Sequence, residues 1–292
     1  MPLRLVESKQ NARVKELRRA LAQPGRIVSR LVGIEGPNLV EEALRAGLRV
    51  ERVFAGERMQ SWVETQQFQD NTEVLIMPSG ILASVLATET PQPVAALVEP
   101  PDWTWAHVLG QDQKKTLIVV LAGLQDPGNL GTILRSAEAF GATGIVSLPG
   151  TVSAWNPKAV RASAGSVFRV PLLAAGEREC LEKLQGAGVK ILASVLRATE
   201  PAERVDLAGP IALIIGNEGN GVTDDLAAKA DGQITIPCPG PVESLNAAVA
   251  ASVLLYEAAR QRASSDSHPF SAAARRAEER MGHGGLKRGT RR

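Results

Sequence analysis

Three short polar motifs in the second half of the chain hold the side chains that could do chemistry. They read DPGNLGTILR at 126–135, IIGNEGNG at 214–221 and IPCPGPVESLN at 236–246. Each follows a short apolar run typical of a buried strand and precedes a helical pattern. Turns of this kind at strand ends of one α/β domain indicate a single crevice built from loops. The polar groups it would offer are Asn, Arg, Glu and Ser side chains, without a His or a metal-binding cluster.

Taken alone, each motif also has a plain structural interpretation. In the first, Pro127-Gly128 predicts a turn, Asn129 can cap the next helix, and Arg135 lies nearly two helical turns later. A helix cap followed by a surface arginine would explain this motif without any function.

The glycines of the second motif stand at positions 216, 219 and 221, which is not the GxGxxG fingerprint. A pyrophosphate cradle is therefore not indicated. The backbone can still approach a ligand closely here, and Glu218 adds a negative group, although an ordinary loop fits equally well.

Three prolines at positions 237, 239 and 241 make the third motif rigid and extended. Ser244, Leu245 and Asn246 are then predicted in the first turn of a long helix over Val242–Arg262, where unpaired amides can receive a ligand's oxygens. Ser244 can equally be the N-cap of that helix.

The pattern along the chain predicts two α/β units. Residues 1–100 form a small unit with strands at Ile27–Ile34, Val50–Ala55, Glu73–Met77 and Val94–Val98. Two prolines at 100 and 101 begin a linker over 101–114. In residues 115–262, apolar strands alternate with helices, which indicates a mostly parallel sheet covered on both faces. Residues 263–292 read as a basic disordered tail.

Charge is balanced overall but basic at both ends. The chain has 33 Lys and Arg against 31 Asp and Glu, a net charge of +2. The basic ends favour a polyanion partner, usually nucleic acid, although solvated surface charge is the simple alternative. In a predicted helix over 9–22, Val14, Leu17 and Leu21 would pack inward. The cations expected to face the phosphates of such a partner are Lys9, Arg13, Arg18 and Arg19.

Other features of the composition indicate a cytoplasmic protein. Only two cysteines are present, Cys180 and Cys238, far apart and outside any Cys/His cluster, so neither a disulfide framework nor a metal site is expected. No signal peptide is apparent, and no run approaches the ~20 apolar residues of a membrane span. Aromatic residues make up 3% of the chain, too few for base stacking to dominate binding.

Together the motifs resemble the SpoU/TrmH family of RNA ribose 2′-O-methyltransferases. The matching stretches are DPGNLGTILRSAEAFG at 126–141, LIIGNEGNGV at 213–222 and IPCPGPVESLNAAVAASVLL at 236–255, with a looser match at 158–165. Residues 1–100 look like the ribosomal-protein-L30-like domain that some members carry. The resemblance implies a deep trefoil knot in the C-terminal α/β domain, S-adenosylmethionine as methyl donor without a metal, and a homodimer.

The resemblance also implies roles for individual residues. Arg135 would hold the substrate phosphate and activate the ribose hydroxyl, Asn129, Ser244 and Asn246 would position the groups, and Glu218 would orient Arg135 or a neighbour. Main-chain groups of Leu196, Gly216, Ile236 and Leu245 would bind the donor. The substrate would be 23S ribosomal RNA, with transfer RNA as the alternative. Two rival functions are a non-catalytic RNA-binding or ribosome-assembly protein of this fold and a nucleotide-dependent oxidoreductase.

Overall fold

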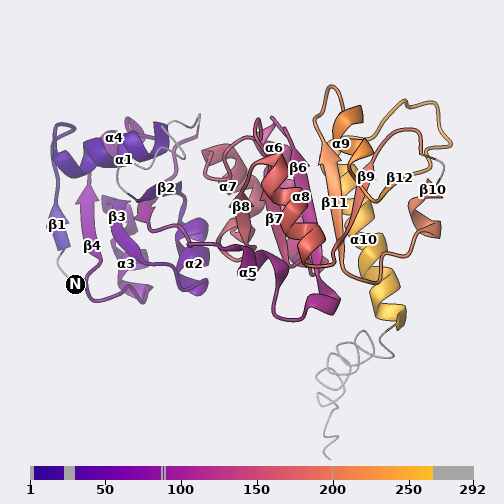
Figure 1. Cartoon of the computed structure of the whole chain (residues 1–292). Coiled ribbons are helices and arrows are strands. Elements are labelled where there is room, and N and C mark those ends of the chain that lie inside the picture. Colours follow the sequence, from indigo (N-terminus) through magenta and orange to yellow (C-terminus); the bar gives the residue numbers. More distant parts are fainter. Residues whose placement is uncertain (1–2, 23–29, 87, 89, 199, 266–292) are drawn as a thin grey trace, which may run out of the picture.

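The chain folds around two β-sheets that lie side by side (Figure 1). This computed structural model describes residues 3–22, 30–86, 88, 90–198 and 200–265. The first sheet has the order β1-β4-β3-β5-β2. Strands β1, β4 and β3 run parallel, whereas β5 is antiparallel to both β3 and β2. Its strands are β1 (Leu3–Leu5), β2 (Val32–Glu35), β3 (Val50–Gly56), β4 (Glu73–Met77) and β5 (Val94–Val98).

Helices cover both faces of this first sheet because its strands are apolar on both sides. Phe54 of β3 packs with α1 (Ala12–Ala22) and α4 (Ser79–Ala83), where Val14, Leu17 and Leu21 are buried as predicted. Val53 points to the opposite face, which α2 (Pro37–Arg45) and α3 (Gln60–Thr65) cover. Helix α2 begins at Pro37. Proline has no backbone N–H, and the first residue of a helix has no acceptor within the helix, so no hydrogen bond is lost there.

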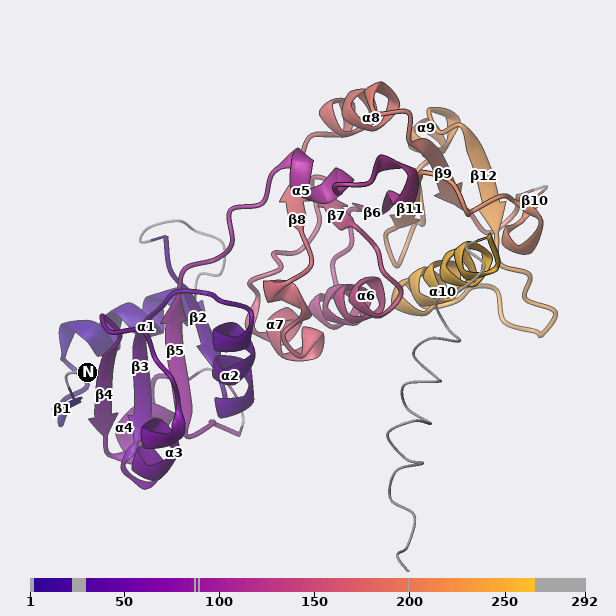
Figure 2. The ribbon, with the colours of Figure 1, turned by 90° about the horizontal axis from the view of Figure 1, so that it is seen from below.

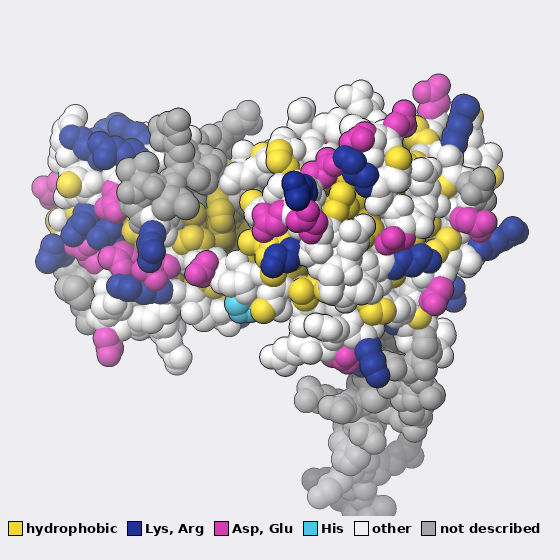
Figure 3. All heavy atoms as spheres, viewed as in Figure 1, with side chains coloured by type: hydrophobic (Ala, Val, Ile, Leu, Met, Phe, Trp, Pro, Cys, Tyr) yellow, Lys and Arg dark blue, Asp and Glu magenta, His cyan; other side chains and the backbone are white. Residues whose placement is uncertain are grey.

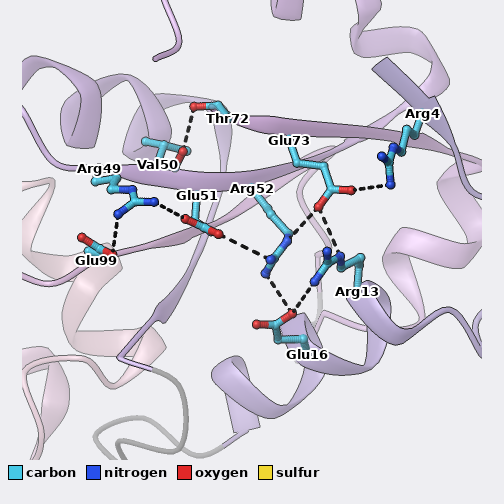
Figure 4. Close-up of polar contacts among 10 residues, drawn as sticks. All are labelled: Arg4, Arg13, Glu16, Arg49, Val50, Glu51, Arg52, Thr72, Glu73 and Glu99. Atoms are coloured by element: carbon cyan, nitrogen blue, oxygen red, sulfur yellow. Dashed lines mark hydrogen bonds and ion pairs between the residues drawn. The ribbon is translucent and has the colours of Figure 1, made fainter. Parts of the chain in front are cut away.

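A ladder of ion pairs crosses the edge of the first sheet (Figure 4). Arg52 of β3 is 8% exposed, and its Nε and Nη1 lie 2.9 Å from carboxylate oxygens of Glu73 and Glu16. Arg13 of α1 joins the same carboxylates at 3.2 and 3.8 Å. Two acids thus share two arginines, which fixes α1 against the strands.

The second sheet is entirely parallel, as the apolar strands predicted. Its seven strands have the order β10-β12-β9-β11-β6-β7-β8. They are β6 (Leu117–Ala122), β7 (Gly144–Ser147), β8 (Leu172–Ala174), β9 (Lys190–Ser194), β10 (Glu200–Pro201), β11 (Ile211–Gly216) and β12 (Gly232–Thr235).

Two layers of helices enclose the second sheet (Figure 2). Leu117, Val119 and Leu121 of β6 face α6 (Pro127–Ala139), α7 (Pro157–Ser163) and α10 (Ala247–Ser265). Ile118 and Val120 face α5 (Trp105–Leu109), α8 (Glu177–Gly186) and α9 (Asp224–Ala228). Short 3₁₀ turns lie at Glu57–Met59 (η1), Gln113–Lys115 (η2), Ser166–Phe168 (η3) and Ala202–Arg204 (η4). No described helix is long and apolar enough to cross a membrane.

The structure differs from the prediction in several places. The helix expected from Val242 begins at Ala247, and the strand expected from Ile27 is β2, which begins at Val32. The segment expected to be a linker contains α5, whose Val108 is fully buried. Strands β1 and β8, three residues each, were not predicted because such short runs carry no periodicity. Residues 27–29 of the first predicted strand and 266–292 of the predicted tail lie outside the described residues.

Candidate active site

The three motifs meet at one edge of the second sheet. Strands β12, β9, β11 and β6 are consecutive neighbours and all parallel, so their carboxyl ends lie at the same edge. The motif residues lie at the ends of these strands, in the loops that follow them, or in the helix α6 that follows β6. This is the position at which open parallel sheets bind ligands.

Asp126 sets the start of α6, the helix that carries Arg135. Its Oδ1 accepts from the backbone N–H of Asn129 at 2.8 Å, so Asp126 is the N-cap and the cap role predicted for Asn129 is wrong. Lys158 of α7 donates to Asp126 Oδ2 at 3.0 Å. The Asn129 amide and, second, the Lys158 ammonium hold the pKa of Asp126 below its usual value. The cap is therefore ionised at neutral pH and ties α6 to α7.

The loop after β11 folds back on itself because Gly216 has no side chain. A Cβ at Gly216 would lie 2.0 Å from the carbonyl carbon of Gly221. Asn217 bonds Gly221 through both backbone groups, at 3.1 and 2.9 Å, and its side-chain Nδ2 donates to the Gly123 carbonyl at 2.8 Å. The second motif is thus fixed against the start of the first.

Glu218 fastens this loop to the N-terminus of α6. Its two oxygens accept from the backbone N–H groups of Gln125 and Asp126, both at 3.1 Å, and Oε1 also accepts from Asn129 Nδ2 at 2.9 Å. Partial burial alone would raise the pKa of Glu218, but these hydrogen bonds outweigh it, so the pKa lies below its usual value. Glu218 is an ionised acceptor.

A chain of amides then connects Glu218 to the third motif. An ionised carboxylate only accepts, so the Asn129 group facing Glu218 must be the NH₂. Asn129 Oδ1 therefore faces Asn246, whose Nδ2 donates to it at 3.0 Å. Asn246 Oδ1 in turn accepts from the N–H of Ala248 at 2.9 Å and caps α10. We call Glu218, Asn129 and Asn246 the amide chain.

This geometry corrects the roles predicted around the third motif. Asn246, not Ser244, caps α10, and neither residue lies in its first turn. Ser244 is exposed and has no hydrogen bond within the described part of the chain. Glu218 orients Asn129, the neighbour, and makes no contact with Arg135.

Arg135 is exposed on α6 and makes no hydrogen bond or ion pair with any described residue. The helix that carries it is held closely. Gly131 lets α7 approach, since a Cβ there would lie 2.5 Å from the Ala162 Cβ. The hydroxyls of Ser136 and Ser252 meet at 2.7 Å and join α6 to α10. A fixed helix therefore presents an uncommitted guanidinium.

The residues predicted for donor binding lie along the same edge. Gly216 is the last residue of β11. Leu196 follows β9, Ile236 follows β12, and Leu245 precedes α10. The apolar side chain of Leu196 is 68% exposed, and the side chains of Ile236 and Leu245 are half-buried. Within the described ranges, the amides of Leu196, Ile236 and Leu245 have no hydrogen-bond acceptor.

The four cations predicted to face RNA differ in whether they have ion-pair partners. Lys9, Arg18 and Arg19 are exposed and have no described partner, whereas Arg13 belongs to the ion-pair ladder of Figure 4. Sequence reasoning missed Lys158 and Asn217 as site residues. An Asp-Pro-Gly run, with proline at the first helical position, was the available signal for Asp126 as the cap.

The described residues contain no group of three or more His, Cys, Asp or Glu side chains that could hold a metal ion. Both cysteines are free, with Cys180 buried and Cys238 exposed.

Two family models match most of the chain. Residues 116–256 match the SpoU rRNA Methylase family, and residues 11–96 match the MRM3-like substrate binding domain. The chain is 33% identical over 256 residues to the 23S rRNA (guanosine(2553)-2′-O)-methyltransferase RlmP of Bacillus subtilis, covering 87% of this chain and 98% of that protein.

Solved structures show the same fold. An AdoMet-bound rRNA methyltransferase from Sinorhizobium meliloti is 30% identical, with a TM-score of 0.78 over 88% of this chain and 98% of that one. The SpoU methyltransferase AviRb of Streptomyces viridochromogenes, in complex with AdoMet, is 28% identical, with a TM-score of 0.77 over 87% and 98% of the two chains. The chain belongs to the SpoU rRNA methylase family.

Proposed function

We propose that this protein transfers the methyl group of S-adenosylmethionine to a ribose 2′-hydroxyl of 23S ribosomal RNA in the cytoplasm. The observation that carries the proposal is that the hydrogen-bonded amide chain lies at the same sheet edge as Arg135, which has no partner among the described residues. The name of the Bacillus subtilis relative supports 23S ribosomal RNA as the substrate and the ribose 2′-oxygen as the methylated atom. Transfer RNA is the alternative substrate.

The loop edge fits such a donor. The amides of Leu196, Ile236 and Leu245 can donate to acceptors of a nucleoside and a carboxylate, while their apolar side chains flank a flat ring. When bound, the donor supplies an electrophilic methyl group on a sulfonium. The chain's part is to hold the ribose hydroxyl in line with that methyl, and such positioning can contribute several kcal/mol.

Arg135 would bind the substrate phosphate and stabilise negative charge on the hydroxyl oxygen. A guanidinium stays protonated, with a pKa above ~12, so it does not act as a base. Its planar fork can grip two phosphate oxygens, and its charge lowers the hydroxyl's pKa. Asn129 and Asn246, held by Glu218, would position the ribose beside it, and Ser244 has a free hydroxyl for the same purpose.

We also propose that the enzyme works as a homodimer through α10. Val249, Val253 and Tyr256 are 47%, 39% and 56% exposed and follow i, i+4, i+7 spacing, which places them on one side of the helix. The Tyr256 ring contacts Phe140 at the end of α6. An apolar stripe of this kind fits a second copy of the chain. Light scattering should give a dimer mass for the wild type and a monomer for Val253→Glu, with Lys183→Glu on α8 as the control.

Residues 1–100 would hold the RNA. Figure 3 shows Lys and Arg side chains gathered over α1, and the exposed cations of that helix are Lys15, Arg18 and Arg19. Residues 101–114 would connect this unit to the methyltransferase unit at 115–262.

The test is a labelling experiment. Tritiated S-adenosylmethionine and total RNA from a strain lacking this gene should give labelled 23S RNA with the purified protein. The labelled linkage should resist alkali, because a methylated 2′-oxygen cannot attack the neighbouring phosphate. Label on a base, or donor binding without transfer, would contradict the proposal.

A further inference from the structure

Arg169 bonds two acids that lie on helices of different α/β units. Its Nη2 lies 3.1 Å from Glu138 Oε2, and its Nε bonds the other oxygen of the same carboxylate. Its Nη1 lies 2.6 Å from Glu42 Oε2. Glu138 belongs to α6 and Glu42 to α2, so one guanidinium holds the last turn of α6 against the first α/β unit.

The local backbone places Arg169 with little freedom. It follows η3, whose Val167 and Phe168 are each 2% exposed, and the Phe168 ring stacks on Trp155. Gly165 adopts φ +92°, and a Cβ there would lie 2.8 Å from the Glu42 Cβ. Glycine therefore allows this turn to approach α2 closely enough for the arginine to reach both acids.

The contact with Arg169 stabilises the charged form of Glu138. The Arg169 guanidinium holds the pKa of Glu138 below its usual value, with a smaller contribution from the Ser166 hydroxyl. Glu138 and Glu42 in turn raise the pKa of Arg169. Glu138 is therefore ionised at neutral pH, and both of its carboxylate oxygens accept from the Arg169 guanidinium.

Glu138 is also three residues after Arg135 on α6. Side chains at i and i+3 are neighbours on a helix surface, about 5–6 Å apart at Cβ, and acids and arginines at that spacing pair. Arg135 nevertheless has no described partner. The difference is that Arg169 already occupies both oxygens of Glu138.

We propose that Arg169 is a positioning residue for methyl transfer, which keeps Arg135 available for RNA by holding Glu138 away from it. This inference rests on the role proposed above for Arg135. Because Glu42 shares the same guanidinium, the availability of Arg135 depends on the docking of the first α/β unit against α6. Docking and chemistry are thereby linked through one side chain.

The test is a pair of variants assayed by the labelling reaction. Arg169→Ala should lower kcat roughly two- to fivefold, since an exposed i, i+3 pair competes for Arg135 without blocking it fully. Donor KM should stay unchanged because the donor edge lies at other loops. Adding Glu138→Gln should restore most of the wild-type kcat, because the competing charge is gone. Glu138→Gln alone should not reduce kcat more than about twofold.

The variant Arg169→Lys tests whether a slower reaction in Arg169→Ala comes from a folding defect. It keeps the charge but cannot grip Glu138 with two parallel bonds, so an intermediate kcat at wild-type thermal stability is expected. A double variant as slow as Arg169→Ala would overturn the inference, since the arginine would then act through docking alone. Wild-type kcat in Arg169→Ala would overturn it as well. Failure of the proposed function is distinct, because the wild-type protein itself would then label no RNA.

Discussion

The side-chain amide of Asn129 donates to the Glu218 carboxylate over 2.9 Å, although the two residues are 89 positions apart in the chain. That contact fixes the direction of the amide, and with it the bond from Asn246 at 3.0 Å. Three loops therefore have one consistent pattern of donors and acceptors. Reversing either side-chain amide would leave two like groups facing each other.

Asn129→Asp tests this dependence with almost no change in shape. The new carboxylate cannot donate to Glu218, and two negative charges would face each other across about 3 Å. Displacing the loops by ~1 Å would cost roughly 10²-fold in kcat. Asn220→Asp, in the loop that carries Glu218, is the matched control, because the Asn220 side chain has no described partner. Comparable losses in the two variants would argue against the amide chain.

The depressed pKa of Glu218 predicts how stability changes in acid. A carboxyl group whose pKa is lower in the folded state stabilises the fold fully above its unfolded value, 4.5, and loses that contribution as the pH falls through the folded pKa below it. The unfolding free energy of Glu218→Gln should therefore lie below that of the wild type at neutral pH, and the difference should shrink below pH 4.5. Glu243→Gln, also exposed and in the same edge, is the control. A constant difference across the acid range would contradict the assignment.

How much of this site could be predicted depends on distance along the chain. The strands at Glu73–Met77 and Val94–Val98 have the predicted bounds, because apolar runs between turn residues define them locally. The meeting of Asn129 with Asn246, 117 residues apart, follows from the order of strands, which no local pattern contains. The predicted start of α10 was wrong. Apolar residues at 242 and 245 continue the helical spacing, but Asn246 is the N-cap, so the helix begins after it. The trefoil knot stays a prediction from the family resemblance.

Arg135→Ala should separate chemistry from donor binding. The guanidinium would contact the RNA, so its removal should lower kcat by about 10²–10³ while the donor Kd, measured by calorimetry, stays near the wild-type value. Arg135→Lys should fail almost as badly, because a point charge cannot replace a planar fork. An equal weakening of donor binding would assign Arg135 to the donor pocket instead.

Gly131 should tolerate no side chain. An added Cβ would meet the Ala162 Cβ at 2.5 Å and the Ala159 carbonyl oxygen at 2.6 Å, so α6 and α7 must separate. Gly131→Ala should lower the unfolding free energy by about 1–3 kcal/mol, although alanine favours helices. Gly186→Ala at the end of α8 meets nothing within 4 Å and should stabilise the protein slightly. Denaturant titrations that give both variants the same sign would contradict this close packing.

The salt dependence of RNA binding should identify the RNA-holding surface. Arg18 and Arg19 are exposed and have no partner among the described residues, whereas reversing Arg13 would also break its pairs with Glu16 and Glu73. Each phosphate contact on a single strand releases counterions and contributes about −0.7 to the slope of log K against log salt.

Arg18→Glu/Arg19→Glu should therefore flatten that slope by roughly 0.7 for each phosphate that the variant no longer binds, and it should raise the KM for RNA. Donor affinity should not change, because the donor edge belongs to the second sheet. Lys183→Glu on α8 gives a charge reversal remote from α1 and should leave the slope as it is. Filter binding of 23S RNA at several salt concentrations measures both variants. An unchanged slope in the double variant would move the RNA-holding role from α1 to the basic segment after residue 265.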